Sequence, residues 1–269
     1  MEVKKILKEL GIKPVRGQNF LISDPVVTSL VEAGEVEGQK VLEIGAGTGV
    51  ITVELAEEAE KVHAVEKNTV LAEHLDERFV EYDNVEVEED DILDYDFSGF
   101  DRCVSNLPFQ LTSKILEKLG ENQVQSALIV QDELADKIVA EPGSSNYGRF
   151  TIRMNYYFIP VKIRTVGKTN FHPAPEVDAA IIKLFPNKKR HGVKNEEQFF
   201  KTVRALFTHK RKKVRNAFVD ARHIFEIEKE TAKELRDEVP HSEERVNKLE
   251  VIQLKEIAEF LDDEIWATD

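Results

Sequence analysis

The sequence has little cysteine and no long apolar run, and each absence narrows the class of protein. Its one cysteine, Cys103, cannot form an internal disulfide or a cysteine-rich metal site, and we expect no metal. Cys103 stands in the apolar run DRCV, which favours a small buried hydrophobe without chemistry. No stretch is apolar for long enough to span a membrane, and the N-terminal MEVKKILKELGIKP lacks the apolar core of a signal peptide. We therefore expect a cytoplasmic protein with no membrane partner.

Positive charge is also scarce, because 37 Lys and Arg face 51 Asp and Glu and give a formal net charge of -14. Such a balance argues against a nucleic-acid partner, since phosphates repel an acidic surface. The charge is uneven, however. Residues 186–218 hold eleven Lys or Arg against two acids, a local charge of +9 that leaves -23 for the remainder. This asymmetry predicts one basic face for a polyanion, and a solvated charged helix is the alternative interpretation.

The chain is long enough for two domains, and its patterning changes near residue 185. Before that point, apolar runs alternate with helical patterns such as VITVELAEEA and TVLAEHLDERF, which indicates parallel strands with helical crossovers. The expected strands are KVLEI, KVHAVE, NVEVE, DRCVS and QSALIV. VKIRTV and VDAAIIKLF follow, joined by GKTNFHPAPE, which is too short and proline-rich for a helix and predicts an antiparallel pair at the sheet edge.

After Phe185 the strand signals stop. PNKKRHG reads as a linker, and four later segments have helical periodicity. They are EEQFFKTVRALF, KKVRNAFVDA, EKETAKELRDE and VIQLKEIAEFL. We therefore predict an α/β domain over residues 1–185, with a parallel Rossmann-like sheet whose last strand is antiparallel, and a small all-α, partly basic domain over residues 186–269.

A glycine-rich loop follows the first predicted strand. Gly45, Gly47 and Gly49 form a G-x-G-x-G pattern typical of S-adenosylmethionine enzymes, whereas a dinucleotide site would need glycine at position 50, which is Val. Glu66 ends the second strand, where its carboxylate can accept both ribose hydroxyls of an adenosine-containing ligand, NAD included. The third strand ends in Glu89-Asp90-Asp91, where an acid can accept from an adenine amino group. Most acidic runs of this kind are simply solvated.

The segment SNLPFQ, residues 105–110, follows the fourth strand at the same edge of the sheet. The Asn106 side-chain oxygen and the Leu107 or Pro108 carbonyl can accept the two hydrogens of an exocyclic base amine, and Phe109 offers a ring for stacking. Alone, the tetrapeptide NLPF within this segment is usually a loop. Phe171, in the loop before the last strand, either covers the other face of the base or fills a proline-stiffened loop.

Eight segments together resemble one known family, the ribosomal RNA adenine dimethyltransferases of the KsgA type, in its archaeal and eukaryotic style. The segments are GQNFL, VLEIGAGTG, Glu66, DDIL, NLPF, EPGSSNYGR, FHPAPEV and FTHKRKKVRNAF. The resemblance implies a class I methyltransferase domain followed by a helical domain. It also implies transfer of four methyl groups from S-adenosylmethionine to two adjacent adenosines near the 3′ end of small-subunit rRNA, during ribosome biogenesis.

The resemblance also assigns residues. The cofactor would be bound by Gln18, Asn19, Leu21, Gly45, Gly47, Glu66, Asp91 and Asn106. The target amine would be held by Asn106, Leu107, Pro108 and Phe109. For the RNA we assign Phe171 and the basic run Lys210, Arg211, Lys212 and Lys213, and we expect a monomer that binds the immature small subunit.

Three positions depart from the family pattern, which most often has Tyr at Phe109, Pro at Ala46 and Gly at Asp90. Phe109 keeps the stacking face. Three other functions remain open: a large-subunit rRNA adenine methyltransferase of the antibiotic-resistance type, a non-catalytic assembly or RNA-binding factor on the same fold, and a nicotinamide oxidoreductase. The intact Asn106, Pro108 and Phe109 argue against the second, and Val50 argues against the third.

Overall fold

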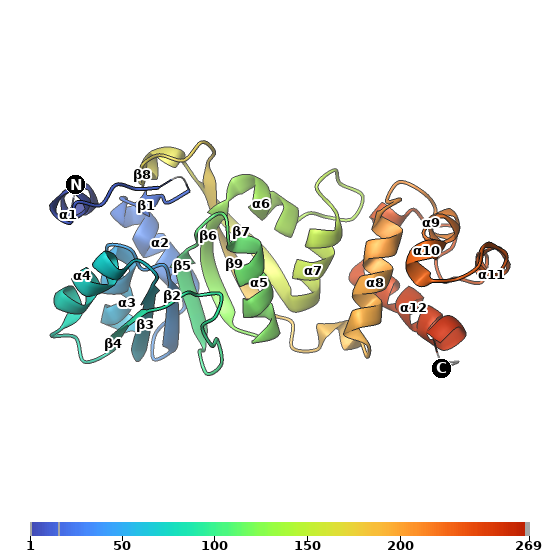
Figure 1. Cartoon of the computed structure of the whole chain (residues 1–269), viewed down its shortest axis with the longest axis horizontal. Helices are drawn as coiled ribbons and strands as arrows, with labels where there is room; N and C mark the ends of the chain where they lie inside the picture. The colour runs from blue at the N-terminus through green and yellow to red at the C-terminus, as the bar shows by residue number, and fades with distance from the viewer. Residues whose placement is uncertain (1, 16, 267–269) are drawn as a thin grey trace. The chain divides into compact units, whose positions relative to one another are not determined.

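The computed structural model describes residues 2–15 and 17–266, and the chain forms two compact units (Figure 1). Unit 1 comprises Met1–Asp136 and Phe158–Pro186, and unit 2 comprises Lys137–Tyr157 and Asn187–Asp269. The chain leaves unit 1 next to the predicted linker. Residues 137–157, which the sequence pattern assigns to the first domain, cluster instead with the helical unit. In the described part of the chain, no helix is long and apolar enough to cross a membrane.

Unit 1 contains a seven-stranded sheet in the order β4-β3-β2-β5-β6-β9-β7. All neighbouring strands are parallel except at β9, which runs antiparallel to both β6 and β7. This confirms the predicted Rossmann-like sheet. The strands are β2 (Lys40–Ile44), β3 (Lys61–Glu66), β4 (Val85–Glu89), β5 (Arg102–Asn106), β6 (Gln125–Gln131), β7 (Phe158–Val166) and β9 (Ala179–Pro186).

Helices cover both faces of this sheet. α2 (Asp24–Gly34) and α3 (Val50–Glu58) share one apolar core with β2, β3, β5, β6 and β9. α5 (Thr112–Glu121) lies on the opposite face, where Figure 1 shows it in front of the sheet. α4 (Thr69–Phe79) packs on β3 and β4. The remaining helices of unit 1 are α1 (Glu2–Glu9), a 3₁₀ turn η1 (Lys168–Asn170) and most of α6 (Asp132–Ile138).

A second, two-stranded sheet joins two distant motifs. β1 (Phe20–Leu21) pairs antiparallel with β8 (Phe171–His172). GQNFL and FHPAPEV therefore lie side by side, which the sequence pattern does not predict. Phe171 is 3% exposed and packs in the core of unit 1. Its ring therefore fills the core of unit 1, as the apolar-plug interpretation expects.

Unit 2 is helical, as the periodicity predicts. Its elements are α7 (Arg149–Tyr157), η2 (Arg190–Gly192), α8 (Glu196–Phe207), α9 (Val214–Asp220), α10 (Arg222–Phe225), α11 (Lys229–Leu235), η3 (Val246–Lys248), α12 (Val251–Leu261) and η4 (Asp262–Trp266). Glu196 fastens α8 to α7, because its carboxylate accepts hydrogen bonds from the hydroxyls of Tyr156 and Tyr157 at 3.0 and 2.9 Å. Residues 137–157 thus belong to unit 2 through packing that no local sequence signal reveals.

Candidate active site

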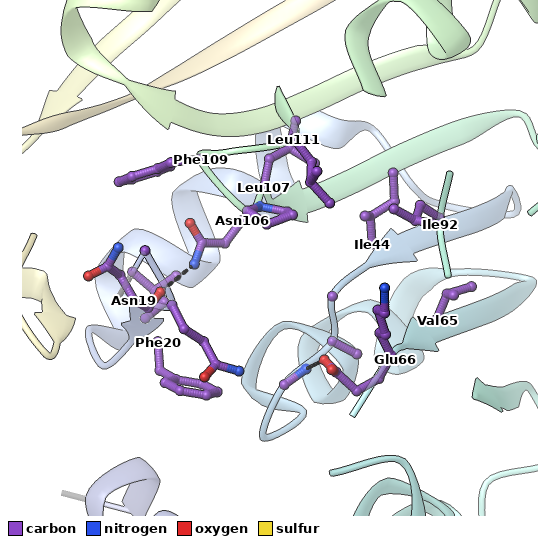
Figure 2. Close-up of a pocket in the computed structure, with 18 of the residues that line it drawn as sticks. Asn19, Phe20, Ile44, Val65, Glu66, Ile92, Asn106, Leu107, Phe109 and Leu111 are labelled. Atoms are coloured by element: carbon purple, nitrogen blue, oxygen red, sulfur yellow. Dashed lines mark hydrogen bonds between the residues drawn. The ribbon is translucent and has the colours of Figure 1, made fainter. Parts of the chain in front are cut away.

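A pocket of about 510 Å³ opens at the carboxyl ends of β2, β3, β4 and β5. This is the edge where open α/β sheets bind ligands. The pocket collects segments that are far apart in the sequence (Figure 2). Among the residues that line it are Gln18, Asn19, Leu21, Gly45, Gly47, Glu66, Asp91, Asn106, Leu107, Pro108 and Phe109. All predicted cofactor and amine residues therefore lie in one place, whereas Phe171 does not line the pocket.

The glycine loop passes close to the N-terminal segment. Gly47 has a positive φ of 61°, and a β-carbon there would approach the ring of Phe20 to 3.2 Å. A side chain would therefore be strained and crowded. Gly45 also has a positive φ, 69°, and the space beside it is open. The loop thus needs glycine for its backbone and leaves room for a ligand.

Glu66 is fixed by the backbone around it. Its Oε2 accepts a hydrogen bond from the Gly47 amide at 3.0 Å, and its Oε1 accepts one from the Asn68 amide at 2.9 Å. The side chain is only 7% exposed. Figure 2 shows the carboxylate held against the glycine loop at the end of β3. Because each carboxylate oxygen has a further lone pair, Glu66 can still accept from a ligand's hydroxyls.

Asp91 is ion-paired within the pocket. Its Oδ1 accepts a hydrogen bond from the Leu93 amide at 3.0 Å, and its Oδ2 accepts one from the Lys67 ammonium at 2.6 Å. The Lys67 ammonium and the Leu93 amide hold the pKa of the Asp91 carboxyl below its usual value. Lys67 also lines the pocket, and the sequence reasoning missed it. Its position directly after Glu66 was the available signal.

The two ends of the Asn106 side-chain amide differ in their hydrogen bonding within the described chain. Its Nδ2 donates to the Asn19 carbonyl at 2.9 Å, as the dashed line in Figure 2 shows. Its Oδ1 is buried and has no hydrogen-bond partner within residues 2–15 and 17–266. A buried acceptor without a partner is costly, so this atom marks where a ligand's N–H belongs. It also fixes which end of the amide faces the pocket.

The two candidate carbonyls beside Asn106 differ. The Pro108 carbonyl already accepts from the Leu111 amide at 2.9 Å and from the Thr112 hydroxyl at 3.2 Å. The Leu107 amide donates to the Ile129 carbonyl at 3.2 Å, while the Leu107 carbonyl accepts no hydrogen bond from the described residues. The structure therefore favours Leu107 over Pro108 as the second acceptor. Phe109 is partly buried and packs against the core of unit 1.

Glu43 is a titratable group that the sequence reasoning did not single out. It is 1% exposed, and its Oε2 accepts a hydrogen bond from the Thr52 hydroxyl at 2.6 Å. Its Oε1 has no partner within the described chain. Burial raises the pKa of Glu43 to about 8, so the side chain is mostly protonated at neutral pH. Cys103 is buried, which raises its pKa to about 12 and agrees with a thiol without chemistry.

The basic run of unit 2 divides into different roles. Lys210 donates to the Ser145 and Tyr147 carbonyls at 3.3 and 3.1 Å and so holds the loop before α7. Lys212 pairs with Asp220 at 2.5 Å, and Lys213 pairs with Glu243 at 2.6 Å. Arg211 is exposed. Of the four predicted RNA contacts, Arg211 presents its charge most freely and Lys210 is chiefly structural.

A mostly parallel seven-stranded sheet with one antiparallel strand, β9, and a pocket at its carboxyl edge is the architecture of the Rossmann-like methyltransferases. Within this class, the model of the family described as ribosomal RNA adenine dimethylase matches residues 11–266. The chain belongs to this family.

Relatives agree over nearly the whole chain. A protein of Thermococcus sibiricus, described as a probable ribosomal RNA small subunit methyltransferase A, is 36% identical, covering 98% of this chain and 97% of its own. A Methanosarcina mazei protein of the same description is 40% identical, covering 84% of each chain. Among solved structures, a dimethyladenosine transferase from Plasmodium falciparum has a TM-score of 0.81 at 26% identity, covering 90% of this chain and 97% of that one. The 23S rRNA methyltransferase ErmE has a TM-score of 0.67 at 24% identity, covering 91% and 100%.

Proposed function

We propose that this chain is an S-adenosylmethionine-dependent adenine dimethyltransferase that acts on small-subunit rRNA. The observation that carries the proposal is the Asn106 amide, whose nitrogen is bound to the Asn19 carbonyl while its oxygen is buried without a partner in the described chain. With the free Leu107 carbonyl, this oxygen forms a pair of acceptors for one NH₂ group. An adenine amine provides the two donors that such a pair requires.

The residues of the pocket also fit the methyl donor. The open space beside Gly45 and the fixed Glu66 carboxylate suit the amino acid and ribose parts, and Asp91 suits an adenine amine. When bound, S-adenosylmethionine supplies a methyl group already activated on a sulfonium. The protein therefore needs no strong base and contributes mainly position and aligned dipoles.

Asn106 and Leu107 make the target amine more nucleophilic. The lone pair of an adenine amine is delocalised into the ring, so the nitrogen is a poor nucleophile. Two acceptors on its hydrogens favour the pyramidal geometry in which the lone pair is available, and water takes the proton after transfer. The Phe109 ring stacks on the base and offsets about 1–3 kcal/mol of the stacking lost when the nucleotide leaves its helix.

The small-subunit assignment is supported by the descriptions of the relatives. We propose two adjacent adenosines near the 3′ end as the target, a monomeric enzyme, and the immature small subunit as the partner. Arg211 would contact its phosphates.

The test is methyl transfer from labelled S-adenosylmethionine to small subunits that lack the modification, with the label mapped by primer extension. We expect adjacent dimethyladenosines. Asn106→Ala should reduce transfer by about 10²- to 10³-fold, because an oriented acceptor is lost, while RNA binding persists. The matched control is Asn122→Ala, which removes an exposed asparagine at the end of α5. Transfer by Asn106→Ala at a rate close to that of the control would refute the role of the amide oxygen.

A further inference from the structure

Lys67 bridges the ends of two neighbouring strands at the pocket. It follows Glu66, the last residue of β3, and its ammonium lies 2.6 Å from the Oδ2 of Asp91, two residues after β4. β3 and β4 are parallel, with Glu66 opposite Glu89, so the ion pair crosses between strand ends at the ligand edge. Both partners line the pocket. The pair therefore forms part of the pocket wall beside the ribose-binding acid.

Lys67 places a positive charge among the carboxylates that line the pocket. Of the described residues that line the pocket, Glu66, Asp90 and Asp91 carry carboxylates, and Lys67 is the one Lys or Arg. Three acids at one edge repel each other. Lys67 opposes this at Asp91, and the pKa values agree, because the hydrogen bond raises that of Lys67 and lowers that of Asp91.

The two hydrogen bonds also fix the direction of the Asp91 carboxylate. The Leu93 amide binds Oδ1 and Lys67 binds Oδ2, so the plane of the group is set from both sides. The side chain remains 29% exposed and each oxygen keeps a lone pair. An ionised carboxylate only accepts hydrogen bonds. It therefore favours a purine with an amino group at position 6 and repels a purine with a carbonyl oxygen there.

On the basis of the proposed function, we propose that Lys67 is a positioning residue that sets the pocket's preference for a 6-aminopurine in the methyl donor. Lys67 acts through Asp91, whose carboxylate it orients and whose charge it balances. The inference deepens the cofactor assignment, because it names the residue that gives the purine end of the pocket its specificity.

The test compares two probes by calorimetry on the full-length protein: S-adenosylhomocysteine and its 6-oxo analogue, S-inosylhomocysteine. The wild type should prefer the amino form by about tenfold or more, as for a hydrogen bond to a charged group. Lys67→Met keeps the length of the side chain and removes its charge. It should weaken S-adenosylhomocysteine binding about two- to fivefold and narrow the preference, whereas Lys67→Arg should restore both. Asp91→Asn should abolish the preference, since an amide also donates.

The matched control is Lys61→Met. Lys61 pairs with Glu86 and so also bridges β3 and β4, but at the other end of β3, away from the pocket. If Lys67 only stabilises strand pairing, both Met variants will behave alike. An unchanged preference in Lys67→Met, or an equal change in Lys61→Met, would overturn the inference and leave the cofactor assignment intact. No binding of S-adenosylhomocysteine to the wild type would instead overturn the proposed function itself.

Discussion

Units 1 and 2 differ sharply in charge. Unit 1 has 16 Lys or Arg against 32 Asp or Glu, and unit 2 has 21 against 19, so their formal net charges are -16 and +2. Unit 1, which contains the pocket, therefore repels phosphates. Its negative charge can favour binding only inside the pocket, where carboxylates can accept hydrogen bonds from neutral or cationic ligand groups. Under the proposed function, we therefore expect unit 2 to supply most of the attraction for RNA.

Unit 2, however, exposes less positive charge than its sequence suggests. Residues 186–218 count +9, yet several of the cations in that stretch pair with acids from later in the chain, such as Lys201 with Glu226 and Lys213 with Glu243. Arg215 also pairs with Glu243. Folding thus neutralises part of the basic stretch. A charge count along the sequence therefore overestimates the positive charge that the folded surface exposes.

The largest effect should arise in unit 1, at Glu43. Its pKa rises from an ordinary 4.5 to about 8, so the folded state holds a proton that the unfolded state releases. Stability is full below pH 4.5 and is lost as pH rises towards 8, on the order of a few kcal/mol. Glu43→Gln should remove this loss. Urea unfolding between pH 5 and about 8.5 measures it, and a parallel decline in the variant would contradict the assignment.

Glu66→Ala should lower the affinity for the cofactor and leave the affinity for RNA unchanged. It removes the carboxylate that we propose accepts the ribose hydroxyls, and two charge-assisted hydrogen bonds correspond to about a hundredfold loss of S-adenosylhomocysteine affinity. RNA affinity should be unchanged, because the charged RNA contacts that we propose lie in unit 2. Calorimetry and filter binding provide the two readouts. If RNA affinity fell as much as cofactor affinity, the division of labour between the units would be wrong.

Lys210 and Arg211 are neighbours with opposite expected phenotypes. Lys210→Ala should lower the free energy of unfolding by about 1–2 kcal/mol, because two carbonyls of the loop before α7 lose a charged donor. Arg211→Ala should leave stability unchanged but weaken RNA binding and reduce its salt slope by about 1. Thermal melting and salt-dependent filter binding test both. Equal effects on melting would mean that the run acts as one structural unit.

The smallest effect is at His241 of unit 2. Partial burial alone would lower its pKa, but hydrogen bonds to Glu256 at 2.7 Å and Glu244 at 2.9 Å raise it overall. The stabilisation is complete below pH 6.5 and disappears as pH rises through the raised value, at less than about 1 kcal/mol after solvent screening. Glu256→Gln should flatten this dependence. A melting series across pH 6 to about 8.5 would detect it, with Glu43→Gln as the common background.

Much of unit 1 follows from sequence because its central strands, β2, β5, β6 and β9, are buried apolar runs. The order of glycine loop, Glu66, Asp91 and Asn106 is predictable, since each stands at the end of a strand and parallel strands end at one edge. The pairing of β1 with β8 is not predictable, because two residues on each side carry no periodic signal. The burial of Phe171 accompanies that pairing, and the sequence supports it as one of two interpretations of this residue.

In unit 2, the features that the sequence does not predict depend on contacts between residues far apart in the chain. Its helices follow from periodicity, but the transfer of residues 137–157 to it depends on long-range bonds such as the Tyr147 hydroxyl to the Leu249 carbonyl at 2.5 Å. Ion pairs between the basic run and later acids are equally long-range. Choosing Leu107 over Pro108 also required the three-dimensional turn that engages the Pro108 carbonyl.

β1 and β8 leave the ribosome at different times. Synthesis runs from the N-terminus, so Phe20 and Leu21 are synthesised early. Their pairing partners, Phe171 and His172, are synthesised only well past the midpoint of translation. Until then, the stretch that carries the Asn19 carbonyl has no strand to pair with, and the amide of Asn106 has no fixed anchor. The parallel strands β2 to β6 are therefore synthesised before the segment that pairs with β1, whereas β9 follows that segment.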